Sequence, residues 1–247
     1  MSKKVRRARH STRLSTRHSI KTAAVTILAI AIAVKLTVVI YDRFVDNNGS
    51  TFKRSDTGKP TSSQLTASEL EALKDAAAVK ALGELTVPDY VNIDYIAPSR
   101  ARTEEKLTGI HNIVIHYTGN PGTTAKQNRH YFGLPETLVC SHFLVGLQGE
   151  IIQCIPLCEQ SAASNFRNVD TISIEVCHPD KSGKFTDESY RSAVKLAAWL
   201  CKSTGLTSDD LIRHHDVTGK ECPKYFVNHP DSWEQFKSDV KQAIEAM

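Results

Sequence analysis

A continuous apolar run, residues 22–41, stands apart from the rest of the chain. It is about as long as the ~20 residues that cross the hydrocarbon core of a bilayer, and Lys35 lies near enough to its far end to reach the interface. The run predicts a transmembrane anchor. A cleaved signal peptide is the alternative reading, although no small-residue cleavage site follows the run. Because positive charge precedes the run, we expect a cytoplasmic tail over residues 1–21 and an extracytoplasmic remainder.

Polar residues dominate the next segment, residues 42–66, which has almost no large apolar side chains and therefore predicts a tether. Residues 67–85 then carry leucines and alanines at helical intervals, and Ser68 with Glu71 forms the pattern of a capping box. We expect residues 42–87 to be a linker that contains a short helix.

Residues 88–247 alternate between strand-like and helix-like patterns. Strands are predicted where β-branched residues alternate or gather, and helices where apolar residues recur at intervals of three and four. The predicted strands are residues 111–117 and 171–177 and a pair within 141–154 that turns at Gln148-Gly149; the predicted helices are residues 124–132, 186–204 and a last one from Ser232. Interleaved strands and helices predict an α/β fold, a sheet with helices packed on its faces.

Composition and charge narrow the function. Hydrophobic residues make up 40% of the chain and charged residues 23%, which are ordinary values for a globular protein. The net charge is +4, but residues 1–21 alone hold eight Lys and Arg and no acidic residue, so the remainder has a net charge of −4. The body of the chain therefore offers no large basic surface, and we expect no nucleic acid among its partners.

Histidine and cysteine gather at two places that suit a metal ion. His116 ends the predicted strand 111–117, and the segment 213–223 contains His214, His215 and Cys222. Zinc prefers imidazole nitrogen and thiolate sulfur, and a catalytic zinc site uses three protein ligands so that a fourth position stays open. Because neighbours on an extended chain point in opposite directions, only one of the two adjacent histidines can readily join His116.

Four segments together resemble a known family. The runs IVIHYTGNPGTTAKQNRHYF, SHFLVGLQGEIIQCIP, TISIEV and HHDVTGKECP are similar, in order and spacing, to the type-2 N-acetylmuramoyl-L-alanine amidases, which include phage lysozymes of the amidase type and animal peptidoglycan recognition proteins. The resemblance covers roughly residues 88–240. It implies a central mixed β-sheet flanked by helices, one Zn²⁺, and hydrolysis of the amide bond between N-acetylmuramic acid and L-alanine in peptidoglycan.

The resemblance also implies roles for individual residues. The metal ligands of the family fall on His116, His214 and Cys222, which assigns the second histidine to His214 and leaves His215 outside the site. Lys220 matches a basic residue that stabilises the oxyanion, and Glu175 matches a strand glutamate that acts as general base in the bacterial branch. The whole would be a cell-wall hydrolase of the autolysin kind, held at the cell membrane by residues 22–41 with its zinc amidase domain, residues 88–247, facing the wall.

Two positions depart from the family pattern. Ser141 stands where phage and animal enzymes carry a tyrosine, and a serine cannot reach a substrate oxygen as a phenol does. The second departure is the stretch 160–163, in which Ala162 lies where relatives often carry a substrate-facing histidine. These departures keep open a non-catalytic peptidoglycan-binding module, although such modules characteristically lose the third metal ligand, which is present here as Cys222.

A cysteine peptidase is a third reading, with Cys222 as nucleophile and His116 or His214 as base. It predicts inactivation by alkylation without any metal. An extracytoplasmic location also permits disulfides, but the sequence does not pair the remaining cysteines. These five are Cys140, Cys154, Cys158, Cys177 and Cys201.

Overall fold

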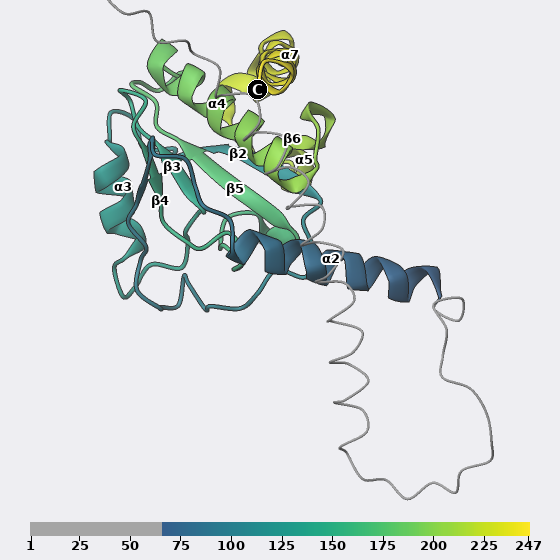
Figure 1. The fold of residues 1–247 in the computed structure, drawn as a ribbon. Coiled ribbons are helices and arrows are strands. Elements are labelled where there is room, and N and C mark those ends of the chain that lie inside the picture. The colour runs from purple at the N-terminus through teal and green to yellow at the C-terminus, as the bar shows by residue number, and fades with distance from the viewer. Residues whose placement is uncertain (1–65) are drawn as a thin grey trace, which may run out of the picture. The chain divides into compact units, whose positions relative to one another are not determined.

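A computed structural model describes residues 66–247, which build one α/β unit around a six-stranded sheet. Figure 1 shows the path of the chain through this unit. In order, the elements are α2 (Ala67–Gly83), β1 (Val91–Ile93), β2 (Asn112–Tyr117), α3 (Ala125–Phe132), β3 (Phe143–Val145), β4 (Ile151–Gln153), the 3-10 turn η2 (Asn165–Val169), β5 (Thr171–Val176), α4 (Asp187–Thr204), the 3-10 turn η3 (Ser208–Asp210), β6 (Leu211–Arg213), α5 (His214–Thr218), α6 (Lys224–Asn228) and α7 (Pro230–Glu245).

The sheet is mixed and runs in the order β1-β4-β3-β5-β2-β6. Its only antiparallel pair is the hairpin β3–β4, which turns through Gly149 at a φ of +84°. The remaining pairs are parallel, among them β2 with β5 and β2 with β6. In parallel strands the carboxyl ends meet at one edge of the sheet, so the ends of β2, β5 and β6 lie together.

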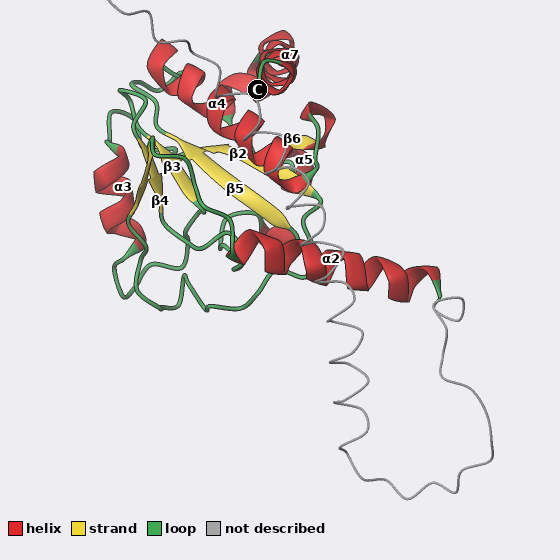
Figure 2. Cartoon of the chain, viewed as in Figure 1, coloured by secondary structure: helices red, strands yellow, loops and turns green. Residues whose placement is uncertain are grey.

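Helices cover both faces of this sheet, as Figures 1 and 2 show. On one face α4 packs over β2, β3 and β5, and α7 packs against α4. Ile115, Ile174 and Val145 belong to the larger core on this face. On the other face α3 packs over β3 and β4, and Leu144 and Ile152 belong to a second core. Because both faces are covered, the central strands are buried along almost their whole length.

The α/β fold with a central mixed sheet and flanking helices agrees with the prediction. The predicted strands and helices are present between residues 111 and 204 with shifts of a few residues at their ends. β1 and β6 were not predicted: each is three residues long, and no hairpin turn like that between β3 and β4 joins it to a neighbouring strand.

Helix starts were the weakest part of the prediction. The last helix begins at Pro230 and not at Ser232, since a proline has no N–H to lose and its fixed φ suits the first helical position. The capping box of α2 is formed by Thr66 and Glu69, two residues before the predicted pair. The end of α4 is as expected, with Gly205 at a φ of +78°.

Helix α2 is attached to the sheet domain through its C-terminal half. Val79 and Leu82 are its buried residues, and Leu82 belongs to the larger core. The predicted domain boundary at residue 88 stays a prediction, and the predicted tail and anchor, residues 1–21 and 22–41, lie outside the described residues. Among residues 66–247, no helix has both the length and the apolar character that a bilayer crossing requires.

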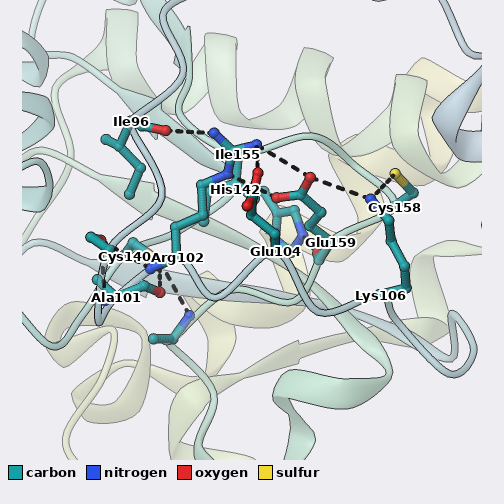
Figure 3. Close-up of polar contacts among 12 residues, drawn as sticks. Ile96, Ala101, Arg102, Glu104, Lys106, Cys140, His142, Ile155, Cys158 and Glu159 are labelled. Atoms are coloured by element: carbon teal, nitrogen blue, oxygen red, sulfur yellow. Dashed lines mark hydrogen bonds and ion pairs between the residues drawn. The ribbon is translucent and has the colours of Figure 1, made fainter.

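A polar cluster lies among the loops near the second core, drawn in Figure 3. Arg102 makes a bidentate contact with Glu159, with Nε donating to Oε2 at 2.8 Å and the terminal nitrogen donating to Oε1 at 3.2 Å. Lys106 adds a third contact to Oε1 at 3.3 Å. Burial alone would raise the pKa of Glu159, but these cations outweigh it and lower that pKa. The cluster thus ties the segment before β2 to the segment before η2.

His142 extends the cluster into the interior of the domain. Its Nδ1 accepts the backbone N–H of Ser173 at 3.0 Å, so Nδ1 carries no proton, and Nε2 must donate to the carbonyl oxygen of Glu159 at 2.8 Å. Burial lowers the pKa of His142 to about 4, although the contact with Glu159 works in the opposite direction. The folded protein therefore holds this imidazole neutral.

This neutral imidazole predicts acid lability. Between pH 6.5 and 4 the unfolded chain binds a proton on His142 that the folded chain does not, so the free energy of unfolding falls as the pH falls, by about 3 kcal/mol from this group over the window. Urea unfolding at pH 7 and pH 4, with a chelator in all samples, should show a smaller loss for His142→Gln than for the wild type. Equal losses in the two proteins would contradict the assignment.

Candidate metal centre

The predicted ligands converge on the sheet edge where β2, β5 and β6 end. His116 lies in β2, directly beside Glu175 of β5 in the register of the parallel pair. His214 is the first residue of α5, which follows β6 without a loop. Cys222 comes after the turn that Gly219 makes at the end of α5, and its carbonyl accepts the N–H of His215 at 2.8 Å. Three segments far apart in sequence, around His116, Glu175 and residues 214–222, thus meet at one place.

The three ligand types form a compact buried group. One ligand atom from each of His116, His214 and Cys222 lies within 4.8 Å of the others. The Sγ atom of Cys222 is 3.8 Å from Nδ1 of His116, and the two imidazole rings are 4.7 Å apart between centroids. Two nitrogens and a sulfur at these separations fit the donor set of a catalytic zinc site, which leaves a fourth position for water or substrate.

The protonation preferences of the group also fit a cation. Burial lowers the pKa of His116 well below its ordinary value, and the charges of His214 and Lys220 lower it further. The imidazole is therefore neutral, and its lone pair is free. Burial also lowers the pKa of His214, and the positive charge of Lys220 adds a smaller lowering. Burial and the nearby Glu175 raise the pKa of the Cys222 thiol to about 12, so at neutral pH a metal cation is what would make it a thiolate.

Glu175 faces the group from the neighbouring strand. Its Oε1 is 3.9 Å from Nδ1 of His116, and its Oε2 is buried with no hydrogen-bond partner among residues 66–247. Burial raises the pKa of Glu175 to about 8, and the charge of Lys220 partly offsets that rise. A buried carboxyl oxygen without a partner is costly, which marks it as a group kept for contact with a substrate or water.

Comparisons with known proteins agree with this geometry. Residues 106–225 match the model of the N-acetylmuramoyl-L-alanine amidase family. The amidase BlyA of Bacillus subtilis (strain 168) is 32% identical over 157 residues, which are 55% of this chain and 42% of BlyA. The amidase CwlL of Bacillus licheniformis is 32% identical over 156 residues, 56% of this chain and 43% of CwlL. Residues 106–225 therefore have the sequence pattern of the N-acetylmuramoyl-L-alanine amidase family.

Solved structures extend the comparison to the fold. The catalytic domain of XlyA superposes with a TM-score of 0.54 at 25% sequence identity. The superposition covers 61% of this chain and 98% of the XlyA domain. PlyL gives a TM-score of 0.55 at 22% identity, which supports the fold alone. The chain spans less than half of the length of the curated amidases BlyA and CwlL.

Within the amidase domain, Lys220 lies on the exposed loop before Cys222. Its positive charge lowers the pKa of His116, His214, Glu175 and Cys222. Three predicted ligands and Glu175 thus lie together, and Lys220 acts on all four through its charge.

The two departures from the amidase pattern have different structural outcomes. Ser141 is fully buried, and its hydroxyl donates to the carbonyl of Phe143 at 2.8 Å, so it points into the domain. Ala162 is half-buried, and its backbone pairs with Cys140. Neither side chain contributes a polar group to the metal centre. All six cysteines of the chain are free thiols.

His215 lies apart from the metal ligands. Its Nδ1 contacts the carbonyl of Lys220 at 3.0 Å, so its ring helps to shape the loop that carries Cys222. The premise that separated it from His214 was wrong in one respect, because both residues are in helix α5 and not in an extended segment. The two side chains diverge because successive helical residues point in different directions.

Sequence reasoning missed two polar contacts on the histidines. Nε2 of His116 is 3.3 Å from Oγ of Ser164, and Nε2 of His214 is 2.8 Å from Oδ1 of Asn165. Both residues lie at the start of η2, in a stretch with no periodic pattern. No signal in the sequence could have connected them to the metal centre.

The adjacent histidines provide a matched test. We expect His214→Ala to lose tight zinc binding, because it removes one of three ligands, and His215→Ala to keep about one zinc per chain. Elemental analysis after dialysis measures both. Zinc retained by His214→Ala and lost by His215→Ala would reverse the ligand assignment.

Proposed function

We propose that this chain is a zinc-dependent cell-wall amidase that hydrolyses the bond between N-acetylmuramic acid and L-alanine in peptidoglycan. The observation that carries the proposal is the buried group of His116, His214 and Cys222 with the orphan carboxyl oxygen of Glu175 beside it. The family and the amidase names of its relatives supply the substrate. When bound, zinc supplies Lewis-acid activation of a water molecule and of the substrate carbonyl.

The protein's own groups would handle the protons and the developing charge. Glu175 would take a proton from the attacking water at its unpartnered Oε2 and return it to the departing alanine nitrogen. A carboxyl whose pKa is raised toward neutrality by burial is suited to both steps. Lys220, an exposed cation on the rim, would face the negative oxygen of the tetrahedral intermediate, and losing such a donor typically costs about 3 kcal/mol of barrier.

Two other functions receive less support. A binding module without catalysis would need neither a third metal ligand nor a buried carboxylate, and both Cys222 and Glu175 are present at the site. A cysteine peptidase would need an accessible thiolate, whereas Cys222 is 3% exposed and burial raises the pKa of its thiol.

Substitution of the proposed base tests the reaction. We expect Glu175→Gln to lower kcat at least about 100-fold while zinc stays bound, because the substitution removes proton transfer and keeps the shape. Glu188→Gln, on the exposed side of α4, is the matched control and should leave kcat unchanged. The assay is the release of peptides with new N-terminal alanine from purified peptidoglycan.

The same assay with a chelator separates the three functions. The amidase predicts that chelation stops cleavage and that added zinc restores it. Zinc binding by the wild type with no cleavage supports the binding module. Cleavage that survives chelation and is blocked by alkylation supports the cysteine peptidase.

We also propose that residues 22–41 anchor the protein in the cell membrane, with residues 1–21 in the cytoplasm and the amidase domain outside. The support is the long apolar run and the eight preceding basic residues. An extracytoplasmic domain would meet peptidoglycan directly.

Deletion of residues 22–41 should move the protein from the membrane fraction to the soluble fraction. In cells that express the full chain, the protein should remain in the pellet after a carbonate wash, because an apolar run of this length leaves a bilayer only at great cost. Detection uses an antibody to the amidase domain. A shortened chain released to the medium would indicate a cleaved signal peptide.

A further inference from the structure

The turn that begins η2 contacts both histidines of the candidate metal centre. Nδ1 of His116 faces Cys222, and its opposite nitrogen, Nε2, is next to the Ser164 hydroxyl. Nε2 of His214 meets the side chain of Asn165 in the same way. The consecutive residues Ser164 and Asn165 thus each contact Nε2 of one of the two histidines.

These contacts select a tautomer for the imidazoles. The Oδ1 atom of Asn165 can only accept a hydrogen bond, so Nε2 of His214 must carry the proton, and Nδ1 keeps its lone pair. The hydroxyl of Ser164 can accept a hydrogen bond from the N–H at Nε2 of His116 in the same manner, which leaves the lone pair on the Nδ1 that faces Cys222. A histidine bound to metal generally donates its other N–H to such a partner, which fixes the ring and raises the basicity of the ligand.

The backbone of this turn is built to hold the two side chains. Asn165 has a φ of +55°, and among residues 66–247 the only other non-glycine residue with positive φ is Glu104. Asparagine tolerates this left-handed conformation better than most residues. The side chain of Asn168 accepts the N–H groups of Ala163 and Ser164 at 3.1 and 2.6 Å, and Ser164 is fully buried.

The turn is also attached firmly to the sheet. Arg167 pairs with Asp170 at 2.8 Å and reaches the side chain of Asn112 at the start of β2. The hydroxyl of Thr171, the first residue of β5, donates to the carbonyl of Arg167. These contacts hold the turn in a fixed position relative to β2 and β5, the strands that carry His116 and Glu175.

We propose that Ser164 and Asn165 are positioning residues that orient His116 and His214 for metal binding and set their tautomers. The inference rests on the proposed metal centre and adds to it the part of the chain that prepares the ligands. Neither residue is a metal ligand, and neither needs to touch the substrate.

Asn165→Gly is the decisive variant, because glycine accepts the left-handed backbone and lacks the side chain. We expect it to weaken zinc binding about 10- to 100-fold. Asn165→Asp keeps an acceptor oxygen and should bind zinc at least as tightly as the wild type. Ser164→Ala removes the contact on His116 and should also weaken zinc binding, by less than Asn165→Gly because its 3.3 Å contact is longer.

The measurement is the zinc dissociation constant of the purified full-length chain, obtained by competition with a chromophoric chelator. The visible spectrum of the cobalt-substituted protein reports the ligand geometry and should change in Asn165→Gly and not in Asn165→Asp. Glu104→Gly is the matched control, since it places glycine at the other left-handed position and should leave zinc affinity unchanged. Circular dichroism of the metal-free proteins establishes that each variant is folded.

The outcomes distinguish this inference from the proposed function. If the wild type binds zinc and the dissociation constant of Asn165→Gly is within threefold of the wild-type value, the positioning role is overturned and the proposed metal centre is not. If Asn165→Gly and Asn165→Asp both bind zinc weakly, the positioning role is also overturned, because the loss is then not due to the missing acceptor oxygen at position 165. A wild-type chain that binds no zinc overturns the metal centre and this inference together.

Discussion

Parallel pairing of β2 with β5 and with β6 is the constraint on which the rest of the site depends. It aligns His116 with Glu175 across one pair and ends β6 immediately before His214. Because the carboxyl ends of parallel strands lie at one edge of the sheet, the pairing of the backbones brings two proposed metal ligands and the proposed base together. The two cores on either side of the sheet then hold that edge rigidly.

Burial gives the site its chemistry. Away from water, both histidines stay neutral, the thiol of Cys222 holds its proton, and the pKa of Glu175 rises to about 8. Each of these preferences avoids a buried charge without a partner, and a divalent cation would bind the free lone pairs of the histidines and replace the thiol proton. The same logic explains the polar surroundings, since Ser164, Asn165 and the Arg102–Glu159 pair satisfy groups that burial would otherwise leave without partners.

Much of the fold and most of the site could be predicted because their signals are local or lie in ordered motifs. The strand at β2 and the helix at α4 have clear hydrophobic periods, and the segments around His116 and Cys222 resemble a family strongly enough to assign ligands. The strands β1 and β6 were not predicted because each is three residues long and, unlike β3 and β4, is not part of a hairpin, although β6 places His214. The start of α7 was predicted at Ser232 and lies at Pro230, because a proline can occupy the first position of a helix as well as precede it.

The sequence by itself determined the residue types of the site, the order in which they occur and the α/β class of the domain, since these follow from composition, spacing and period. Only the tertiary structure decided which atoms face one another. It turned Ser141 into the interior, separated His215 from the candidate metal centre, and brought Ser164 and Asn165 to the Nε2 atoms of His116 and His214. The physical reason for the last two contacts is that hydrogen bonds between residues 48 and 49 positions apart depend on how strands pair and where loops return, and no local sequence pattern specifies that.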